Sequence, residues 1–226
     1  MVMVSHVVQK IVNDKIFLLE PMMRGIIAYG SLAELLKPEV EAELGKEVKN
    51  HAIVMALRRY AETLAAEHKT IVFDYSSEII LKTDICDIAM HRSPTLLSKL
   101  KRLYDIVDFE KGDILNIIHG QREVSVVTNE RYREKLLKIL SGETILNIER
   151  DLVSLTLTYS KDFLYTPGVI YNIVRSIAWE NINIYEIVST NTELTFILNK
   201  KDGIKGYKVL EKLVEHNTDK KQVGST

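Results

Sequence analysis

The clearest alternation of hydrophobic and polar residues lies near the C-terminus. In residues 152–159, hydrophobic side chains alternate with serine and threonine, which is the two-residue period of a half-buried strand. A polar and aromatic loop follows at 161–168, and a hydrophobic stripe at helical spacing then predicts a helix, with stripe residues Val169, Ile170, Ile173, Val174, Ile177 and Ala178. Residues 181–184 end this helix and start a strand, and residues 194–198 alternate as another. The stretch predicts the order strand, loop, helix, strand, strand.

A similar pattern begins at Thr83. A strand that includes Cys86 precedes a loop, a helical stripe, strands at 113–118 and 123–127, a second helix and a closing strand at 145–148. The helical stripe consists of Leu96, Leu97, Leu100, Leu103, Tyr104 and Val107. The two stretches can be superimposed, because Pro94 falls on Pro167, and such repetition supports a repeated fold.

The repeat predicts two β-α-β-β-α-β units at 83–149 and 150–216, followed by a polar tail at 217–226. No strand-forming run follows the second helix of the second unit. Its closing strand is therefore missing or supplied from elsewhere, for example from residues 71–73 or 78–81.

Two motifs in the second unit carry a family resemblance. Thr-Pro-Gly-Val-Ile at 166–170 and Asn-Ile-Asn-Ile at 181–184 together resemble the ACT domain, a small regulatory module that typically binds amino acids. The likeness is greatest to the paired C-terminal regulatory domains of aspartokinases, without the kinase portion. The resemblance implies an α+β fold, with an N-terminal helical domain followed by two ferredoxin-like units.

The resemblance also implies a ligand site where the first strand of a unit passes into its first helix. The N–H groups of a helix N-terminus suit a carboxylate, and Gly168 would let a ligand approach the backbone closely. The implied ligand-binding residues of the second unit are Asp162, Thr166, Pro167, Gly168, Val169, Ile170, Asn181 and Asn183. Turn chemistry and helix capping explain the Pro-Gly pair and Asn181 equally well, so both interpretations stay open.

The first unit departs from this pattern. Its loop has Thr95 where the second unit has glycine, and a β-carbon there would crowd the approach to the backbone. Arg92 is then either a partner for a ligand carboxylate or a solvated surface charge.

Residues 1–66 are predicted to be helical. Ser31 is a candidate N-cap, Pro38 a break or restart, Gly45 a C-terminal stop, and Asn50 the cap of a helix that reaches Leu64. Residues 67–82 are either a connector or a hairpin that adds an edge strand or a wing.

Two helices joined by the turn at 44–50 are also typical of a helix-turn-helix. DNA contacts would then come from Lys46, Lys49, Arg58 and Arg59. Residues 1–66 contain as many acidic as basic side chains, whereas DNA-binding domains usually carry a basic footprint. A packing or dimerisation module is therefore favoured over DNA contact.

Composition and charge narrow the functional classes. The chain of 226 residues is 46% hydrophobic and 27% charged, and its net charge of −1 gives no general electrostatic case for nucleic acid or an anionic membrane. No membrane span or signal peptide is recognisable. The single cysteine, Cys86, excludes an internal disulfide, fits a reducing cytoplasm, and is expected to be a buried small hydrophobic residue.

Catalytic and metal-binding patterns are not recognisable. No glycine-rich phosphate loop follows a strand, and the six histidines show no metal-ligand spacing. We therefore expect no catalysis and no cofactor. The expected function is that of a cytoplasmic, non-catalytic regulator that senses a small molecule, with an amino acid as the favoured class.

Two alternatives remain open. One is an amino-acid-responsive transcription regulator, and the other is a regulatory subunit that docks on a biosynthetic enzyme. A homodimer is expected because open four-stranded sheets leave edges that favour pairing with another copy.

Overall fold

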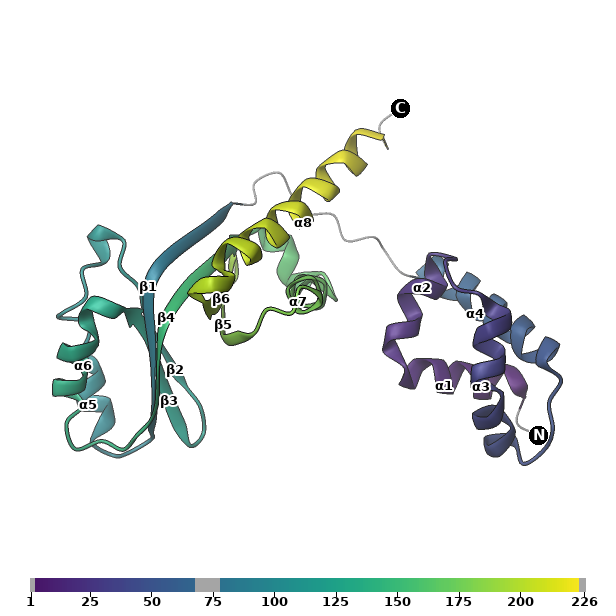
Figure 1. Cartoon of the computed structure of the whole chain (residues 1–226), viewed down its shortest axis with the longest axis horizontal. Coiled ribbons are helices and arrows are strands. Elements are labelled where there is room, and N and C mark those ends of the chain that lie inside the picture. The colour runs from purple at the N-terminus through teal and green to yellow at the C-terminus, as the bar shows by residue number, and fades with distance from the viewer. Residues whose placement is uncertain (1–2, 68–77, 224–226) are drawn as a thin grey trace. The chain divides into compact units, whose positions relative to one another are not determined.

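The computed structural model describes residues 3–67 and 78–223. The chain divides into two units, Met1–Thr70 and Ile71–Thr226, and each is described by itself. Figure 1 labels their helices and strands. Residues 71–73, one expected source of a closing strand, lie outside the described residues.

The N-terminal unit is helical, as the sequence predicts. It contains α1 (Val4–Asp14), a 3-10 turn at Ile16–Leu18, α2 (Leu19–Met23), α3 (Tyr29–Leu44) and α4 (Asn50–Glu67). Each helix buries a hydrophobic stripe in one shared core. The largest fully buried side chains of this core are Met22, Leu36, Ile53 and Leu57.

Helix α3 corrects two predictions. It begins at Tyr29, so Ser31 lies inside the helix and is not its N-cap. Pro38 also lies inside α3 and neither breaks nor restarts it. A proline in a helix interior costs ~3 kcal/mol. The helix continues because Leu36 and Val40, on either side of Pro38, are fully buried in the core.

The turn between α3 and α4 is stabilised differently from the prediction. Gly45 ends α3 in the left-handed conformation, with φ 65°, which confirms the predicted stop. Asn50 is the first residue of α4, and within the described residues its Oδ1 accepts no hydrogen bond, so the expected cap is not made. Glu41 Oε1 instead accepts a hydrogen bond from the Val48 N–H at 2.8 Å.

The C-terminal unit is built on a six-stranded antiparallel sheet in the order β2-β3-β1-β4-β6-β5. The long central strands are β1 (Ile79–His91) and β4 (Ile145–Thr158), with β2 (Leu115–His119) and β3 (Glu123–Asn129) on one side and β6 (Glu193–Asn199) and β5 (Ile184–Ser189) on the other. The expected α+β class, with a helical N-terminal part, is confirmed.

Each central strand serves both halves of the sheet. The first segment of β1, Ile79 to Lys82, pairs with Leu157 to Ser154 of β4, and the later part of β1 pairs with β3 and with the start of β4. Residues 79–82 of β1 therefore form the strand beside residues 154–157 of β4. The expected unit boundaries at Thr83 and after residue 149 fall inside these continuous strands.

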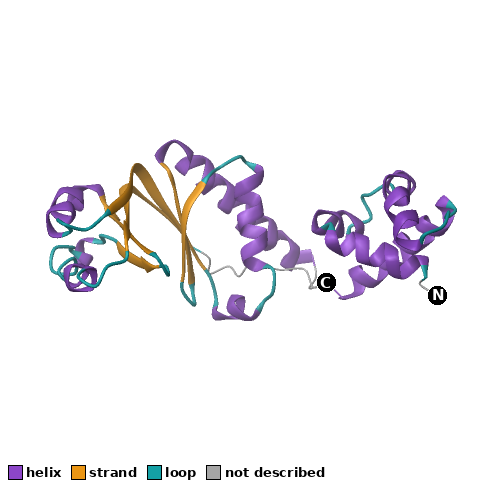
Figure 2. Ribbon diagram, turned by 90° about the horizontal axis from the view of Figure 1, so that it is seen from below, coloured by secondary structure: helices purple, strands orange, loops and turns teal. Residues whose placement is uncertain are grey.

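Helices cover each half of the sheet (Figure 2). Helices α5 (Leu96–Lys101) and α6 (Arg133–Ile139) pack on the half formed by β2, β3 and the adjoining segments of β1 and β4. Helices α7 (Val169–Trp179) and α8 (Gly203–Val223) pack on the other half. Helix α8 runs through most of the residues expected to form a polar tail.

The face without helices holds a third, smaller core. Ile85, Val127, Leu152 and Ile197 are fully buried there. Ile118 of the edge strand β2 and Tyr185 of the opposite edge strand β5 both pack against this core. Since strands at opposite edges contact the same residues, the sheet is curled around its helix-free face.

Most of the predicted helical stripe residues are buried, but four of them are exposed: Leu97, Tyr104, Ile170 and Ala178. Tyr104 and Ile170 were placed on buried stripes, but their exposed fractions are 56% and 51%. α5 ends at Lys101, so Tyr104 lies in a turn beyond it, while Ile170 lies on the open side of α7. Cys86 is fully buried, as predicted, and burial raises its pKa to about 12.

Candidate functional site

The loop between β4 and α7 is anchored by aromatic side chains. The ring of Tyr159 stacks on that of Phe163, with centroids 4.9 Å apart, and Phe163 is buried in the core beneath α7. The Tyr159 hydroxyl donates toward the carbonyl oxygens of Thr190 and Glu193, both at 3.2 Å. A 3-10 turn at Lys161–Tyr165 leads into the predicted ligand loop, so that loop is fixed to the β5–β6 turn.

Gly168 lies at the N-cap of α7 and has a φ of 86°. Residues with a side chain rarely adopt this conformation, so the glycine is required by the turn itself. Its carbonyl oxygen accepts hydrogen bonds from the backbone N–H and the side-chain amide of Asn172, both at 3.0 Å. The start of α7 is therefore well defined.

The first turn of α7 has no side-chain cap. Gly168 provides no capping side chain for the backbone N–H groups of this turn. Such groups, together with the positive end of the helix dipole, favour an anion. Val169 is buried in the core, while Ile170 is half exposed beside the donors.

The structure brings only some of the predicted site residues together. Thr166, Pro167 and Gly168 are exposed and adjoin the first turn of α7, and the side chain of Asp162 lies outside the described residues. Asn181 and Asn183 lie beyond the other end of α7. Since α7 has 11 residues, its two ends are separated by ~16 Å at ~1.5 Å per residue.

Asn181 has a structural role at the C-terminal end of α7. It adopts the left-handed conformation, with φ 55°, and its N–H donates to the Ala178 carbonyl at 2.9 Å. The next N–H, of Ile182, donates to the Ile177 carbonyl at 3.4 Å. These two bonds form a Schellman motif, which is the capping interpretation that the sequence left open.

The corresponding loop of the first half, residues 92–95, is occupied by a side chain of the protein itself. The Glu143 carboxylate accepts hydrogen bonds from the hydroxyl groups of Ser93 and Thr95. The Lys99 ammonium group lies 2.6 Å from Glu143 Oε1, and the Glu143 side chain is only 2% exposed. The Lys99 ion pair and the two hydroxyl donors lower the pKa of Glu143 to about 2.

Arg92 does not hold this carboxylate. It is exposed, its backbone N–H donates to the Arg122 carbonyl at 2.9 Å, and its guanidinium group makes no ion pair within the described part of the chain. Lys99 supplies the cation that contacts this carboxylate.

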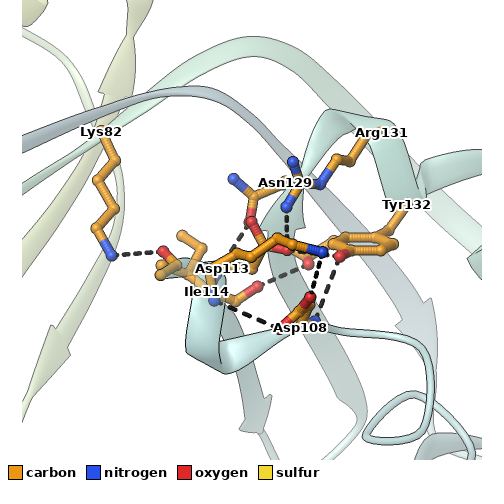
Figure 3. Close-up of polar contacts among 10 residues, drawn as sticks. Lys82, Asp108, Asp113, Ile114, Asn129, Arg131 and Tyr132 are labelled. Atoms are coloured by element: carbon orange, nitrogen blue, oxygen red, sulfur yellow. Dashed lines mark hydrogen bonds and ion pairs between the residues drawn. The ribbon is translucent and has the colours of Figure 1, made fainter.

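A second buried carboxylate fixes the loop before β2 (Figure 3). The side chains of Arg131 and Tyr132 converge on Asp113 Oδ2 and lower the pKa of Asp113. Lys82 of β1 donates to the Gly112 carbonyl at 2.7 Å, which connects this loop to the first segment of β1. Asp113 Oδ2 accepts from two side chains of the same unit, and the Asp113 N–H donates to the Asp108 carbonyl. We therefore assign the cluster to positioning of the loop.

The helix-free face of the sheet carries acidic residues, among them Asp87, its cross-strand partner Glu149 and Glu186. The Ser125 hydroxyl donates to the buried Asp87 carboxylate. Burial is the main cause that raises the pKa of Asp87, and Glu149 raises it further. Burial, followed by the charge of Asp87, also raises the pKa of Glu186 on β5. In the described residues, no group of three or more His, Cys, Asp or Glu side chains is arranged to hold a metal ion.

The basic residues considered for DNA contact lie at the turn before α4 and on α4. Lys46, Lys49, Arg58 and Arg59 are all exposed. The other lysine and arginine residues between positions 3 and 67 form ion pairs with glutamates, for example Lys15 with Glu39 at 2.8 Å. Within the described residues, no helix is long and apolar enough to cross a bilayer.

Sequence reasoning missed Glu143, Asp113 and Asp87. Glu143 lies 50 positions from Ser93, so no local spacing connects the two residues. Asp87 stands in a strand whose other residues gave the expected alternation, and alternation alone did not reveal that this acidic residue is buried. Asp113 stands at the start of the strand expected at 113–118, and that position did not reveal its partners.

No protein-family model matches the sequence, and a search of curated proteins finds no match. Solved structures show the same fold. The regulatory subunit of aspartate kinase from Thermus flavus matches with 14% identity and a TM-score of 0.50, over 63% of this chain and 98% of that chain.

Two aspartate kinases match over part of their length. That from Clostridium acetobutylicum is 16% identical, with a TM-score of 0.51 over 66% of this chain and 36% of that chain. That from Synechocystis is 15% identical, with a TM-score of 0.51 over 74% of this chain and 31% of that chain. The likeness to aspartokinase regulatory domains expected from the sequence is confirmed at the level of fold.

Proposed function

We propose that this protein is a non-catalytic regulator whose sheet is formed by two ACT-like units and which senses an amino acid. The first unit comprises β2, β3, the later segment of β1 and the start of β4. The second comprises β5, β6 and the end of β4, and it is completed by Ile79 to Lys82 of β1. Their paired pattern and the shared fold with aspartokinase regulatory domains support this assignment.

The observation that carries the proposal is the first turn of α7. The N–H groups of this turn receive no side-chain cap, and the turn follows a loop that the Tyr159–Phe163 stack holds in place. A ligand carboxylate would accept hydrogen bonds from these groups at ~2.7–3.0 Å. Thr166, Pro167 and Gly168 border the carboxylate, Ile170 contacts the rest of the ligand, and Asp162 is the proposed partner of its ammonium group.

Asn181 and Asn183 stay outside this proposed site. The length of α7 separates them from the first turn of the helix, and Asn181 caps its C-terminal end. Within one protomer, we propose that Asn181 and Asn183 contribute to the fold of the second unit and do not contact the ligand.

A thermal-shift screen of the twenty amino acids tests the proposal. A ligand at ~100 times its dissociation constant adds ~2.7 kcal/mol to the free energy of unfolding, so at least one amino acid should raise the melting temperature. If no amino acid raises it at millimolar concentration, amino-acid sensing is wrong.

We also propose a homodimer. The end strands β2 and β5 each have one neighbour in the sheet, and an unpaired strand edge favours association with another chain. Sedimentation at micromolar concentration should show a dimer, and a monomer would contradict this part of the proposal. Mobility-shift measurements with genomic DNA separate the proposal from the DNA-binding alternative, for which a protein–DNA complex is required.

A further inference from the structure

The first half of the sheet contains a complete carboxylate-binding site. Its donors come from one short segment: the hydroxyl groups of Ser93 and Thr95, and the ammonium group of Lys99 one turn later. The Thr95 hydroxyl lies 2.8 Å from Glu143 Oε1, and the Lys99 ammonium 2.6 Å from the same atom. Two hydroxyl donors and one cation are a typical donor set for a carboxylate.

The donors are themselves held in place. The Ser93 hydroxyl oxygen accepts a hydrogen bond from the Leu96 N–H at 3.1 Å, which orients its proton toward Glu143. Lys99 also donates to the Ser141 carbonyl at 2.7 Å, in the same connection that contains Glu143. Ser93 and Lys99 are therefore each held by a contact besides the contact with the carboxylate.

We infer that loop 92–95 and Lys99 form a carboxylate-binding site that the side chain of Glu143 occupies permanently, as a built-in substitute for a free ligand. Glu143 lies between α6 and β4, and the Thr144 carbonyl accepts a hydrogen bond from the His91 N–H at 2.9 Å. The backbone thus delivers the carboxylate to the loop without the entropy loss of a second molecule. A free carboxylate has to displace a group that is tethered beside the site.

The second half is built without this closure. The strand that completes it, Ile79 to Lys82, comes from the N-terminal end of β1, and in the described residues α8 is followed by no strand. The position that Glu143 holds between α6 and β4 therefore has no counterpart after α8 in the described chain. One part of the inference rests on the proposed function. Because Glu143 occupies loop 92–95, a free amino acid binds at the loop before α7 instead.

The inference is tested without knowledge of that amino acid. The Glu143→Ala variant removes Cγ, Cδ and both carboxylate oxygens, which is the heavy-atom set of an acetate ion. Acetate should raise the melting temperature of Glu143→Ala well above its value in sodium chloride of equal ionic strength, whereas the wild-type protein should show no such difference. Acetamide, which has the same shape and no charge, should not replace acetate.

The matched control adds Lys99→Met to Glu143→Ala. The double variant lacks the cation of the site, so the acetate-specific stabilisation should be lost. If Glu143→Ala is unfolded in chloride, the folded fraction in acetate and in chloride is compared instead, and recovery in acetate supports the inference.

Equal melting temperatures of Glu143→Ala in acetate, chloride and acetamide would overturn the inference. Full stabilisation of the Glu143→Ala, Lys99→Met double variant by acetate would also overturn it. Neither result depends on the amino-acid screen. A screen that finds no ligand, together with acetate rescue of Glu143→Ala, would refute the proposed function and leave the carboxylate site intact.

Discussion

Asp84 of β1 and Asp151 of β4 lie on adjacent strands and both adopt left-handed backbone conformations, with φ 59° and 54°. The pairing of β1 with β4 shifts register around them, once between Lys82 and Ile85 and again between Ile85 and Asp87. Each strand thus contributes one extra residue where the two halves of the sheet meet. This double bulge lets one pair of strands serve both halves.

The change in stability caused by substituting either aspartate should therefore depend on how well the new residue tolerates the left-handed conformation. A left-handed conformation costs a residue with a β-carbon ~1–2 kcal/mol, and Asn, Asp and Gly tolerate it best. We expect Asp84→Val and Asp151→Val each to lower the free energy of unfolding by about 1–2 kcal/mol. Asp84→Gly and Asp151→Gly should be neutral or stabilising in urea unfolding.

Thr83→Val is the matched control for Asp84→Val, since Thr83 is an exposed neighbour that has no positive φ. It should change stability little. Equal effects of Val at 83 and 84 would show that the left-handed conformation does not determine the outcome.

Gly168 and Gly30 should respond to alanine in opposite directions. Gly168 has a φ of 86°, so alanine there should cost about 1–2 kcal/mol. Gly30 lies in α3 with no atom within 4 Å of an added β-carbon, so alanine should stabilise by about 0.5–1 kcal/mol. Chemical denaturation of the two variants checks both signs, and stabilisation by Gly168→Ala would exclude the strained turn.

The acid limb of the stability curve should depend on Glu143. Its pKa is lowered from 4.5 to about 2 in the folded protein. A group with a lowered pKa stabilises the fold above its unfolded pKa, and that contribution is lost as the pH falls through the folded pKa. Wild-type stability should therefore decrease from about pH 4.5 toward pH 2.

The Glu143→Gln variant lacks this titration. Its stability should be lower than that of the wild type at pH 7 and should fall less between pH 4.5 and 2. Parallel acid-unfolding curves for the two proteins would show that Glu143 is not held as a carboxylate.

The ionised carboxylate of Asp87 should lower the stability of the fold, whereas that of Glu143 raises it. The pKa of Asp87 is raised by burial, so its carboxylate disfavours the fold, and this cost appears as the pH rises through the folded pKa. Asp87→Asn retains an acceptor for the Ser125 hydroxyl and removes the charge that faces Glu149 and Glu186. The variant should melt at a higher temperature at pH 7, and the difference should disappear as the pH falls through the raised pKa of Asp87 toward its ordinary value of 3.8. A lower melting temperature at pH 7 would contradict a buried, uncompensated charge.

Local periodicity predicted much of the fold. Helical and strand periodicity show which side chains share one face of an element. Ile173 and Ile177 of the helical stripe are buried as predicted, and so are Leu155 and Leu157 of the alternating strand. The helical N-terminal residues and the stop at Gly45 were also correct, because stripes and caps are local features.

The errors arise where distant contacts override local preference. Pro38 stays in a helix because its neighbours Leu36 and Val40 are buried, and the propensity of one residue does not reveal that. Two predicted strands merge into β4 because a left-handed Asp151 permits a bulge in place of a turn. Glu143 could not be assigned, since its partners lie in a loop about 50 residues earlier.

The central claim is that an amino acid binds at the first turn of α7, and titration calorimetry with a variant pair tests it most directly. Ile170 and Ile204 are each the second residue of their helix, and both are exposed, at 51% and 62%. Glutamate at 170 places a negative charge beside the proposed carboxylate contacts, while glutamate at 204 places the same charge on α8.

The measurement titrates the wild type, Ile170→Glu and Ile204→Glu with the amino acid that gives the largest thermal shift. The account predicts that Ile170→Glu weakens binding by at least ~10-fold, which corresponds to ~1.4 kcal/mol, and that Ile204→Glu binds like the wild type. Wild-type affinity in Ile170→Glu, with a folded protein, would contradict the account.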